Sequence, residues 1–317
     1  MARLIVVTPN PATDVTYRVP VYENGSTVRV SDVSRRPGGK GLNVVRVLRT
    51  LGEPAVAVLP LGGASGQWVS SMMDAEGISA SIVPIAGETR STVAVVDPVG
   101  HPTLFNEPGP ALTQDEGGRL IEATVRECEP GCAVVISGSL PPGLDPQWLE
   151  HLVRAVRAVG AKVLVDTSGE ALLAAARAGA DVLKPNAQEA IQATNDNRLP
   201  LVSSSDGPVG IAPELHAAVT HLQQLGATTV VVSQGAGGLV AFAEGRVVSQ
   251  PAVRGVSGNP TGAGDAATAG FALAWARGDD LRNALKLAAA LGAAAVKQPG
   301  AGEVDPADVR AFEEELS

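Results

Sequence analysis

The sequence predicts an α/β fold with a mainly parallel central sheet that is covered by helices. From residue 133 onward, short runs rich in Val, Leu and Ile alternate closely with longer Ala- and Leu-rich runs of helical periodicity. The strand-like runs are apolar throughout rather than alternating between apolar and polar residues, which is typical of strands buried on both faces. Together these observations predict a parallel sheet flanked by helices.

Composition and periodicity also predict the individual elements. Strands are expected where short β-branched runs occur, at residues 4–8, 56–59, 93–96, 133–137, 162–166, 181–183, 229–233 and 239–242. Helices are expected where apolar residues recur at helical spacing, at residues 42–51, 66–76, 114–127, 146–159, 170–177, 213–225, 264–277 and 281–296.

Two stretches, residues 14–36 and 90–106, depart from this pattern. They are strand-like with polar alternation, of which residues 27–31 are typical. Because an isolated two-stranded unit is barely stable, we expect the two stretches to pair into a small sheet that serves as a lid or a dimer surface. We expect one domain over residues 1–317 with this insert, and a long loop at residues 195–210, which are rich in turn formers.

Composition and charge exclude several classes of function. Of the 317 residues, 45% are apolar and 18% are charged, so the chain can bury a sizeable core and is not disordered. The formal net charge of -9 argues against nucleic-acid binding, and no apolar run approaches the roughly 18–20 residues of a membrane span. The four histidines and two cysteines form no zinc-binding pattern. We expect a globular, cytoplasmic protein.

The strongest local signal is the sequence Gly262, Ala263, Gly264 and Asp265, which precedes a long helix of small residues. Glycines ahead of a helix leave backbone N–H groups free to bind an anion, and the helix dipole favours a negative charge there. A carboxylate in the first turn could accept a proton from a hydroxyl that attacks a phosphate. A plain glycine turn with a capping Asp265 is the structural alternative.

A second glycine cluster, residues 37–43, also leads into a helix. It lacks the Gly-x-x-x-x-Gly-Lys-Ser/Thr spacing of a Walker A loop. Around it, between residues 25 and 52, six basic residues face a single acidic one, Asp32, which gives a local charge of +5. The basic residues are Arg29, Arg35, Arg36, Lys40, Arg46 and Arg49. Such a segment in an acidic protein indicates a site for a small anion, with function favoured for Gly39, Lys40 and Asn43, whereas Arg46 and Arg49 fit a solvated helix face.

Two further polar clusters follow predicted strands, at residues 184–189 and 233–238. Ligands of open parallel sheets bind beyond the carboxyl ends of the strands, so both clusters occupy the expected edge. Asn186 and Glu189 could hold a hydrated Mg²⁺. Each cluster alone is also compatible with an ordinary turn.

Taken together and in this order, these motifs closely resemble the PfkB branch of the ribokinase-like sugar kinases. The matching motifs are TPNPATD at 8–14, GGKGLN at 38–43, ETR at 88–90, NEPGP at 106–110, SGSLPPG at 137–143, KPN at 184–186, SxG at 233–235 and GAGD at 262–265. They span nearly the whole chain. The early motifs are similar to those of the hexose-phosphate subgroup, which contains 1-phosphofructokinase, tagatose-6-phosphate kinase and the minor 6-phosphofructokinase.

The resemblance implies a ribokinase-like three-layer α/β/α sandwich with a small β lid that often mediates dimers, and it implies ATP and Mg²⁺ as cofactors. It assigns Asp265 as catalytic base and the amides of residues 262–264 as the anion hole. The sugar-phosphate residues that it implies are Asp14, Gly39, Lys40, Asn43, Arg90 and Ser139, with Arg90, Ser139 and either Lys40 or Arg29 on the phosphate. The nucleotide residues that it implies are Lys184, Asn186, Ser233, Gly235, Gly238 and Asn259. Glu189 would act on the metal through water.

The resulting functional prediction is ATP-dependent phosphorylation of a ketohexose phosphate to a bisphosphate, with fructose 1-phosphate to fructose 1,6-bisphosphate as the first choice. Tagatose 6-phosphate and fructose 6-phosphate are the alternatives within the subgroup. An unphosphorylated sugar or a nucleoside is disfavoured by Arg90 and the basic segment, and an inactive sugar-phosphate sensor by the intact motifs. The sequence departs from the subgroup at Thr13, Thr92, Ala190 and Gln234. Thr13 and Thr92 bear on which sugar is bound.

Overall fold

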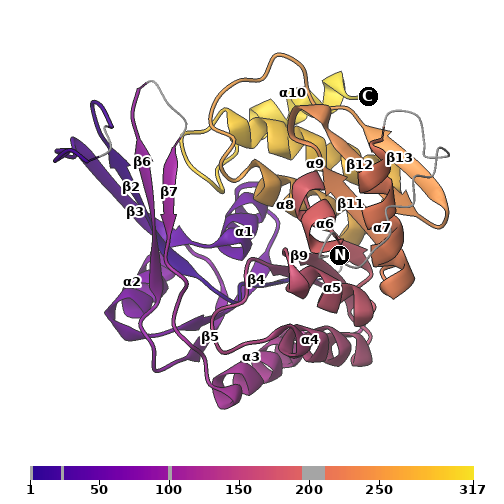
Figure 1. Cartoon of the computed structure of the whole chain (residues 1–317), viewed down its shortest axis with the longest axis horizontal. Coiled ribbons are helices and arrows are strands. Elements are labelled where there is room, and N and C mark those ends of the chain that lie inside the picture. The colour runs from indigo at the N-terminus through magenta and orange to yellow at the C-terminus, as the bar shows by residue number, and fades with distance from the viewer. Residues whose placement is uncertain (1–2, 23–24, 99–101, 195–210) are drawn as a thin grey trace.

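The structure, a computed structural model, describes residues 3–22, 25–98, 102–194 and 211–317. Its main sheet has nine strands in the order β13-β12-β11-β10-β9-β8-β1-β4-β5 (Figure 1). In chain order these strands are β1 (Leu4–Val7), β4 (Ala55–Leu61), β5 (Ala80–Pro84), β8 (Ala133–Ser137), β9 (Lys162–Asp166), β10 (Val182–Leu183), β11 (Thr229–Ser233), β12 (Leu239–Ala243) and β13 (Arg246–Gln250).

The main sheet is parallel from β5 to β11 and ends in the antiparallel pairs β11–β12 and β12–β13. Strand β1 lies between β4 and β8. The sheet is therefore extended on both sides of β1, by β4 and β5 on one side and by β8 to β13 on the other. The carboxyl ends of the parallel strands share one edge, where open α/β sheets bind their ligands. The predicted parallel sheet is therefore confirmed.

Helices cover both faces of the main sheet, which gives the three layers that the motifs imply (Figure 1). Alternate residues of a strand enter two separate cores: Leu4 and Val6 pack with α1, α8 and α9, whereas Ile5 and Val7 pack with α4 and α5. Within the described part of the chain, no helix is both long and apolar enough to cross a bilayer. The helices are α1 (Lys40–Thr50), α2 (Gly63–Ala75), α3 (Gln114–Glu127), α4 (Pro146–Ala158), α5 (Glu170–Arg177), α6 (Ala187–Thr194), α7 (Pro213–Leu225), α8 (Ala263–Arg277), α9 (Leu281–Val296) and α10 (Pro306–Glu315).

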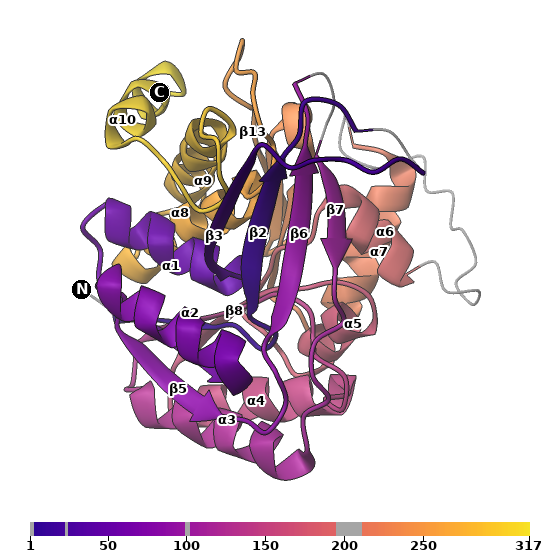
Figure 2. The same ribbon diagram turned by 90° about the vertical axis from the view of Figure 1, so that its left-hand side faces the viewer.

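The two polar strand-like stretches form a second sheet of four strands in the order β3-β2-β6-β7 (Figure 2), and this sheet stands beside the main body (Figure 1). Its strands are β2 (Ala12–Arg18), β3 (Asp32–Gly38), β6 (Arg90–Val96) and β7 (Thr103–Asn106). The prediction was wrong for residues 27–31, which precede β3 and form no strand. The register of β3 with β2 begins only at Asp32, and Ser31 adds a single backbone hydrogen bond, from its N–H to the carbonyl of Arg18 at 2.8 Å. The loop predicted at residues 195–210 lies outside the described residues.

Candidate active site

Five polar side chains from four segments meet at the carboxyl edge of the main sheet. Strand β9 ends in Asp166, and Lys184 directly follows β10. Helix α8 carries Asp265 in its first turn, while α1 begins with Lys40 and carries Asn43 one turn later. The parallel arrangement of the strands places these segments at one edge, so distant parts of the sequence form a single cluster.

Asp166 is the most strongly bound carboxylate of this cluster. Its Oδ1 lies 3.2 Å from Nζ of Lys40 and its Oδ2 lies 3.2 Å from Nζ of Lys184. The hydroxyl of Thr268 donates to Oδ2 at 2.6 Å. Burial alone would raise the pKa of Asp166, but the two lysines and the hydroxyl outweigh burial and lower it to about 2. The same pairing raises the pKa of Lys40, chiefly through Asp166.

Asp265 is also buried, at 7% exposure, but none of the described residues forms an ion pair with it. Its Oδ2 accepts a hydrogen bond from Nδ2 of Asn43 at 2.8 Å. Burial, together with the nearby negative charge of Asp166, raises the pKa of Asp265 to about 7, although Lys40 and Asn43 oppose the shift. A carboxylate with a pKa near the working pH is suited to accept and release a proton.

The backbone before Asp265 forms an open glycine turn at the start of α8. Gly262 caps α8 in the left-handed conformation, with φ of 84°, and a Cβ there would lie 2.6 Å from Cβ of Ala301. A Cβ at Gly264 would meet nothing within 4 Å, so the space beside this turn is free. Free N–H groups and the helix dipole favour an anion at this point. The turn and Asp265 can therefore act on the same phosphate.

Asn186 and Glu189 cap the start of α6 reciprocally. The backbone N–H of Asn186 donates to Oε2 of Glu189 at 2.8 Å, and the backbone N–H of Glu189 donates to Oδ1 of Asn186 at 2.8 Å. Oε1 of Glu189 faces Nζ of Lys40 at 3.8 Å. The described residues contain no group of three or more His, Cys, Asp or Glu that could hold a metal ion. Asn186 and Glu189 therefore fit a hydrated Mg²⁺ that is bound through Oε1 of Glu189 and otherwise by water.

A second cluster lies where the small sheet meets the main body. Arg90 donates from Nη1 to the carbonyl of Glu107 at 2.8 Å and from Nη2 to the carbonyl of Asn10 at 3.0 Å. The amide nitrogen of Asn10 lies 3.4 Å from the hydroxyl of Ser139. Nε of Arg90 and Oδ1 of Asn10 are buried without a partner among the described residues. Buried polar atoms left in this state are typical of a site that a polar ligand completes.

Asp14 lies close to this second cluster, on the neighbouring strand. It is the register partner of Thr92, whose hydroxyl donates to Oδ1 at 2.5 Å. Burial raises the pKa of Asp14, against the opposing effects of Thr92 and nearby arginines. Gly38 passes so close that a Cβ there would lie 2.0 Å from Cγ of Asp14. Gly39, with φ of 106°, then turns the chain into α1, so this segment joins Asp14 to Lys40 and Asn43.

Five of the six predicted nucleotide residues lie around the ends of β10 and β11, and Asn259 lies apart from them. Ser233 pairs with Asn186 in an isolated parallel β-bridge, and a Cβ at Gly235 would meet nothing within 4 Å. Gly238, with φ of 88°, packs so closely on Gln250 that any side chain would collide with its carbonyl. Asn259 is held at the loop before α8, where its amide donates to the carbonyl of Pro299 at 3.2 Å. No hydrogen bond or ion pair among the described residues joins Asn259 to the other members of this group.

The structure corrects the interpretation of the basic segment. Arg46, assigned above to a solvated helix face, is only 9% exposed and pairs with Glu76 at 3.1 Å. Its guanidinium is enclosed by acceptors at the C-cap of α2, in β3 and on α1 itself. Arg36 pairs with Glu303, whereas Arg29, Arg35 and Arg49 are exposed, so the six cations do not converge on one site.

Sequence reasoning also missed two residues of the clusters, Asp166 and Asn10. Both signals were present, because Asp166 ends a predicted strand and Asn10 belongs to the motif at residues 8–14. Their roles depend on partners that are remote in sequence, namely the two lysines and Arg90.

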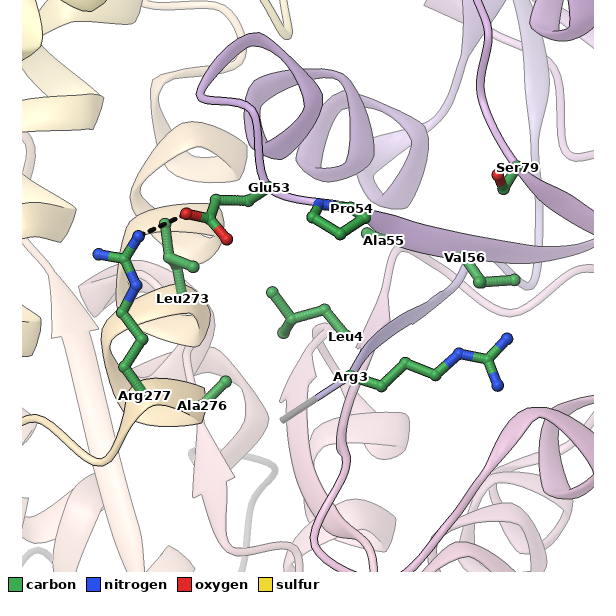
Figure 3. A pocket seen from close by; sticks show the side chains of 10 residues that line it. All are labelled: Arg3, Leu4, Glu53, Pro54, Ala55, Val56, Ser79, Leu273, Ala276 and Arg277. Atoms are coloured by element: carbon green, nitrogen blue, oxygen red, sulfur yellow. Dashed lines mark hydrogen bonds and ion pairs between the residues drawn. The ribbon is translucent and has the colours of Figure 1, made fainter. Parts of the chain in front are cut away.

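A separate cavity of about 330 Å³ lies at the opposite, amino-terminal edge of the sheet (Figure 3). Leu4, Leu273 and Ala276 line it, with an ion pair between Arg277 and Glu53 at one side. It shares no residue with either polar cluster.

Comparison with known proteins assigns the chain to a class. Residues 8–308 match the pfkB family of carbohydrate kinases. The structure of phosphofructokinase-2 from Escherichia coli in complex with potassium is 31% identical, with a TM-score of 0.90 over 100% of this chain and 99% of that chain. The complex of the same enzyme with fructose-6-phosphate is 30% identical, with a TM-score of 0.88 over 100% and 99%. A possible 1-phosphofructokinase from Thermotoga maritima shares the fold at 23% identity, with a TM-score of 0.81 over 98% and 97%.

The family match and the shared fold therefore define the protein as a carbohydrate kinase. The chain is a member of the pfkB family of carbohydrate kinases. Its resemblance to the hexose-phosphate subgroup of that family is confirmed.

Proposed function

We propose that this protein transfers the γ-phosphate of ATP to a hydroxyl of a ketohexose phosphate and so produces a bisphosphate. The observation that carries the proposal is the buried Asp265, whose pKa is raised to about 7, beside the open N-terminal turn of α8. That arrangement supplies a base and an anion site at one place, which is what phosphoryl transfer to an alcohol requires.

The proposed proton path is short. The ionised carboxylate of Asp265 accepts the proton of the attacking hydroxyl as the new O–P bond forms and the bond to ADP breaks. The N–H groups of Gly262 and Gly264 and the ammonium of Lys40 would offset the negative charge of the transferring phosphate, whereas the N–H of Ala263 donates to the carbonyl of Pro260 at 3.2 Å. Asp166 holds Lys40 and Lys184 in position, because it contacts both at 3.2 Å.

The residues at the nucleotide end fit ATP with a hydrated divalent metal. Gly235 and Gly264 leave open space where a side chain would otherwise stand. Lys184, Asn186 and Ser233 would contact the phosphates, while Gly238 and Asn259 would shape the nucleoside end. Glu189 would hold the metal through water by Oε1. When bound, the metal neutralises charge on the phosphates of ATP.

The cluster around Arg90 supports a substrate that already carries a phosphate. The Nε of Arg90 and the unpartnered atom of Asn10 provide a donor and an acceptor near Ser139. Asp14 would accept hydrogen bonds from sugar hydroxyls, with Gly39 and Asn43 completing that side. A second phosphate has to approach ATP, so a fixed cation at this end offsets the repulsion.

Fructose 1-phosphate and fructose 6-phosphate would give the same product, fructose 1,6-bisphosphate, from opposite orientations of the sugar. The motifs led to fructose 1-phosphate as the first choice. The 31% identity to phosphofructokinase-2, whose complex with fructose-6-phosphate is 30% identical, supports fructose 6-phosphate as the first acceptor to test. Tagatose 6-phosphate is the third candidate.

We also propose that the protein is a homodimer joined through the small sheet. The register puts Val33, Tyr17, Val95 and Thr103 in one cross-strand row, with Phe105 on the same face next to that row. Val33 is 48% exposed and Phe105 is 53% exposed. A second copy of the same face would cover these apolar side chains. A related structure is described as the tetrameric inhibited form of phosphofructokinase-2 from Escherichia coli.

The function is tested by ADP release with MgATP and each of five acceptors: fructose 1-phosphate, fructose 6-phosphate, tagatose 6-phosphate, fructose and adenosine. We expect turnover with at least one phosphorylated ketohexose and higher kcat/KM than with fructose or adenosine. Arg90→Ala should raise KM for the sugar phosphate and leave KM for ATP unchanged. Turnover with fructose or adenosine alone would contradict the substrate class, and binding without turnover on any acceptor would indicate a sensor.

A further inference from the structure

Arg46 lies directly behind the cluster that contains Asp265. It is on α1, two turns after Lys40, and all three of its guanidinium nitrogens donate hydrogen bonds. Nε donates to Glu76 at 3.1 Å, Nη2 to the carbonyl of Pro37 at 2.8 Å and Nη1 to Oδ1 of Asn43 at 3.3 Å. These acceptors come from three different segments of the chain, so the planar guanidinium is held in one orientation.

The contact with Arg46 determines which way the Asn43 amide points. A guanidinium has donors and no acceptor, so the amide atom that faces it must be the oxygen. The nitrogen then points to the other side, where Nδ2 donates to Oδ2 of Asp265 at 2.8 Å. A flipped amide would set donor against donor at Arg46 and oxygen against oxygen at Asp265.

The surroundings leave the Asn43 amide little freedom to turn. Asn43 is 5% exposed and Asp265 is 7% exposed. Gly302 closes the other side, where a Cβ would lie 2.9 Å from Oδ1 of Asn43 and 3.0 Å from Nη1 of Arg46. The hydrogen-bond chain from Arg46 through Asn43 to Asp265 is therefore enclosed by protein.

We propose that Arg46 is a positioning residue for phosphoryl transfer, which orients the Asn43 amide so that Asn43 holds the carboxylate of Asp265. This inference rests on the proposed function, in which Asp265 is the base. Arg46 acts only through Asn43. Its own charge is directed at Glu76, which lies at the end of α2.

The hydrogen bond from Asn43 affects the proton affinity of Asp265. Three charged groups from other elements face this carboxylate: Asp166 raises its pKa, whereas Lys40 and Lys184 lower it. The hydrogen bond from Asn43 lowers it too. Loss of the oriented donor should therefore move the pKa of Asp265 further above about 7.

A double-mutant cycle tests the inference. Arg46→Met should lower kcat on the order of tenfold, the scale of one hydrogen bond to a charged group. In an Asn43→Ala background the same change should have no further effect, because its route to Asp265 is gone. Arg49→Met is the matched control, since Arg49 is exposed on the same helix. Independent, additive losses in the cycle would overturn the inference.

A carboxyl ¹³C NMR titration provides a readout that does not depend on turnover. Asp265→Asn identifies the signal of Asp265, and Arg46→Met should shift its titration to higher pH, whereas Arg49→Met should not. If Arg46→Met does not fold, Arg46→Lys replaces it, because one ammonium cannot serve three acceptors. Absence of turnover in the wild type would contradict the proposed function. An unshifted titration in the folded variant would overturn the role of Arg46 alone.

Discussion

Asp166 and Asp265 are two buried carboxylates of one cluster with opposite proton affinities. Asp166 contacts two lysines and a hydroxyl, and its pKa is about 2. Asp265 contacts an amide and, among the described residues, no cation, and its pKa is about 7. Both carboxylates are buried, so their partners decide the difference in pKa. One carboxylate is a permanent charge that holds two lysines, and the other is free to exchange a proton.

The largest expected effect comes from removing the exchangeable carboxylate. Asp265→Asn keeps the shape and the burial but cannot accept a proton, so kcat should fall by roughly 10²–10⁴-fold. KM values should change much less. Steady-state ADP release on the best acceptor measures this, and turnover close to wild type would show that Asp265 is not the base.

Breaking the permanently charged side should cost stability. Lys184→Met leaves the buried Asp166 with Lys40 and the hydroxyl of Thr268, and we expect a loss of about 1–3 kcal/mol in the free energy of unfolding at pH 7, the scale of a hydrogen bond to a charged group. Because folding lowers the pKa of Asp166 from 3.8 to about 2, its ionisation stabilises the fold fully above pH 3.8. This contribution is lost as the pH falls to about 2. The difference between wild type and variant should shrink over the same range.

Denaturant titration at several pH values measures this difference. Lys286→Met is the control, since the only hydrogen bond of the Lys286 side chain among the described residues goes to the hydroxyl of Ser317 at 3.1 Å. Equal stability of Lys184→Met and Lys286→Met at pH 7 would show that the Asp166 cluster is not a stabilising element.

A smaller effect is expected at the proposed sugar site, where a third carboxylate, Asp14, accepts a hydrogen bond from the hydroxyl of Thr92. Thr92→Val removes the 2.5 Å hydrogen bond to Asp14 and should raise KM for the sugar phosphate about tenfold, the scale of a hydrogen bond to a charged group. Thr92→Ser retains the hydroxyl and should stay close to wild type. KM for ATP should not change in either variant. If KM for ATP rose together with KM for the sugar phosphate, Thr92 would act on the fold of the small sheet instead.

The smallest effect on chemistry is expected from the outer face of the small sheet. Phe105→Asp should shift the protein from dimer to monomer in sedimentation velocity, because it buries a charge in the proposed interface. Leu104→Asp is a matched control, since Leu104 is 52% exposed but points to the opposite face. An unchanged sedimentation coefficient for Phe105→Asp would contradict the proposed interface.

The sequence was sufficient for seven of the nine strands of the main sheet, for the two stretches that contribute the small sheet, and for the glycine turn before Asp265. Each of these is encoded locally, in apolar runs, polar alternation or adjacent glycines. Helix α10 was not predicted, since Val309 is its only buried residue and few of its other residues are apolar. The edge strands β5 and β13 were also missed, since each has a single buried residue.

Long-range partners explain the remaining differences. Nothing near Arg46 in the sequence indicates that Glu76 and the carbonyl of Pro37 surround it. Likewise, the contrast between Asp166 and Asp265 depends on Lys40 and Lys184, which lie more than 100 residues apart in sequence. Residue patterns show which side chains are suited to chemistry, but pairing across the sheet edge decides which carboxylate titrates.

The central claim is that the ionised form of Asp265 accepts the proton during transfer. The most direct test is the pH dependence of kcat/KM, from pH 5.5 to 8.5, for the wild type and for Asp265→Asn. Because the pKa is raised to about 7, activity should rise with pH and be half-maximal near 7 in the wild type. The residual activity of Asp265→Asn should follow only the ionisation of the substrates. The same profile in both proteins would contradict the account.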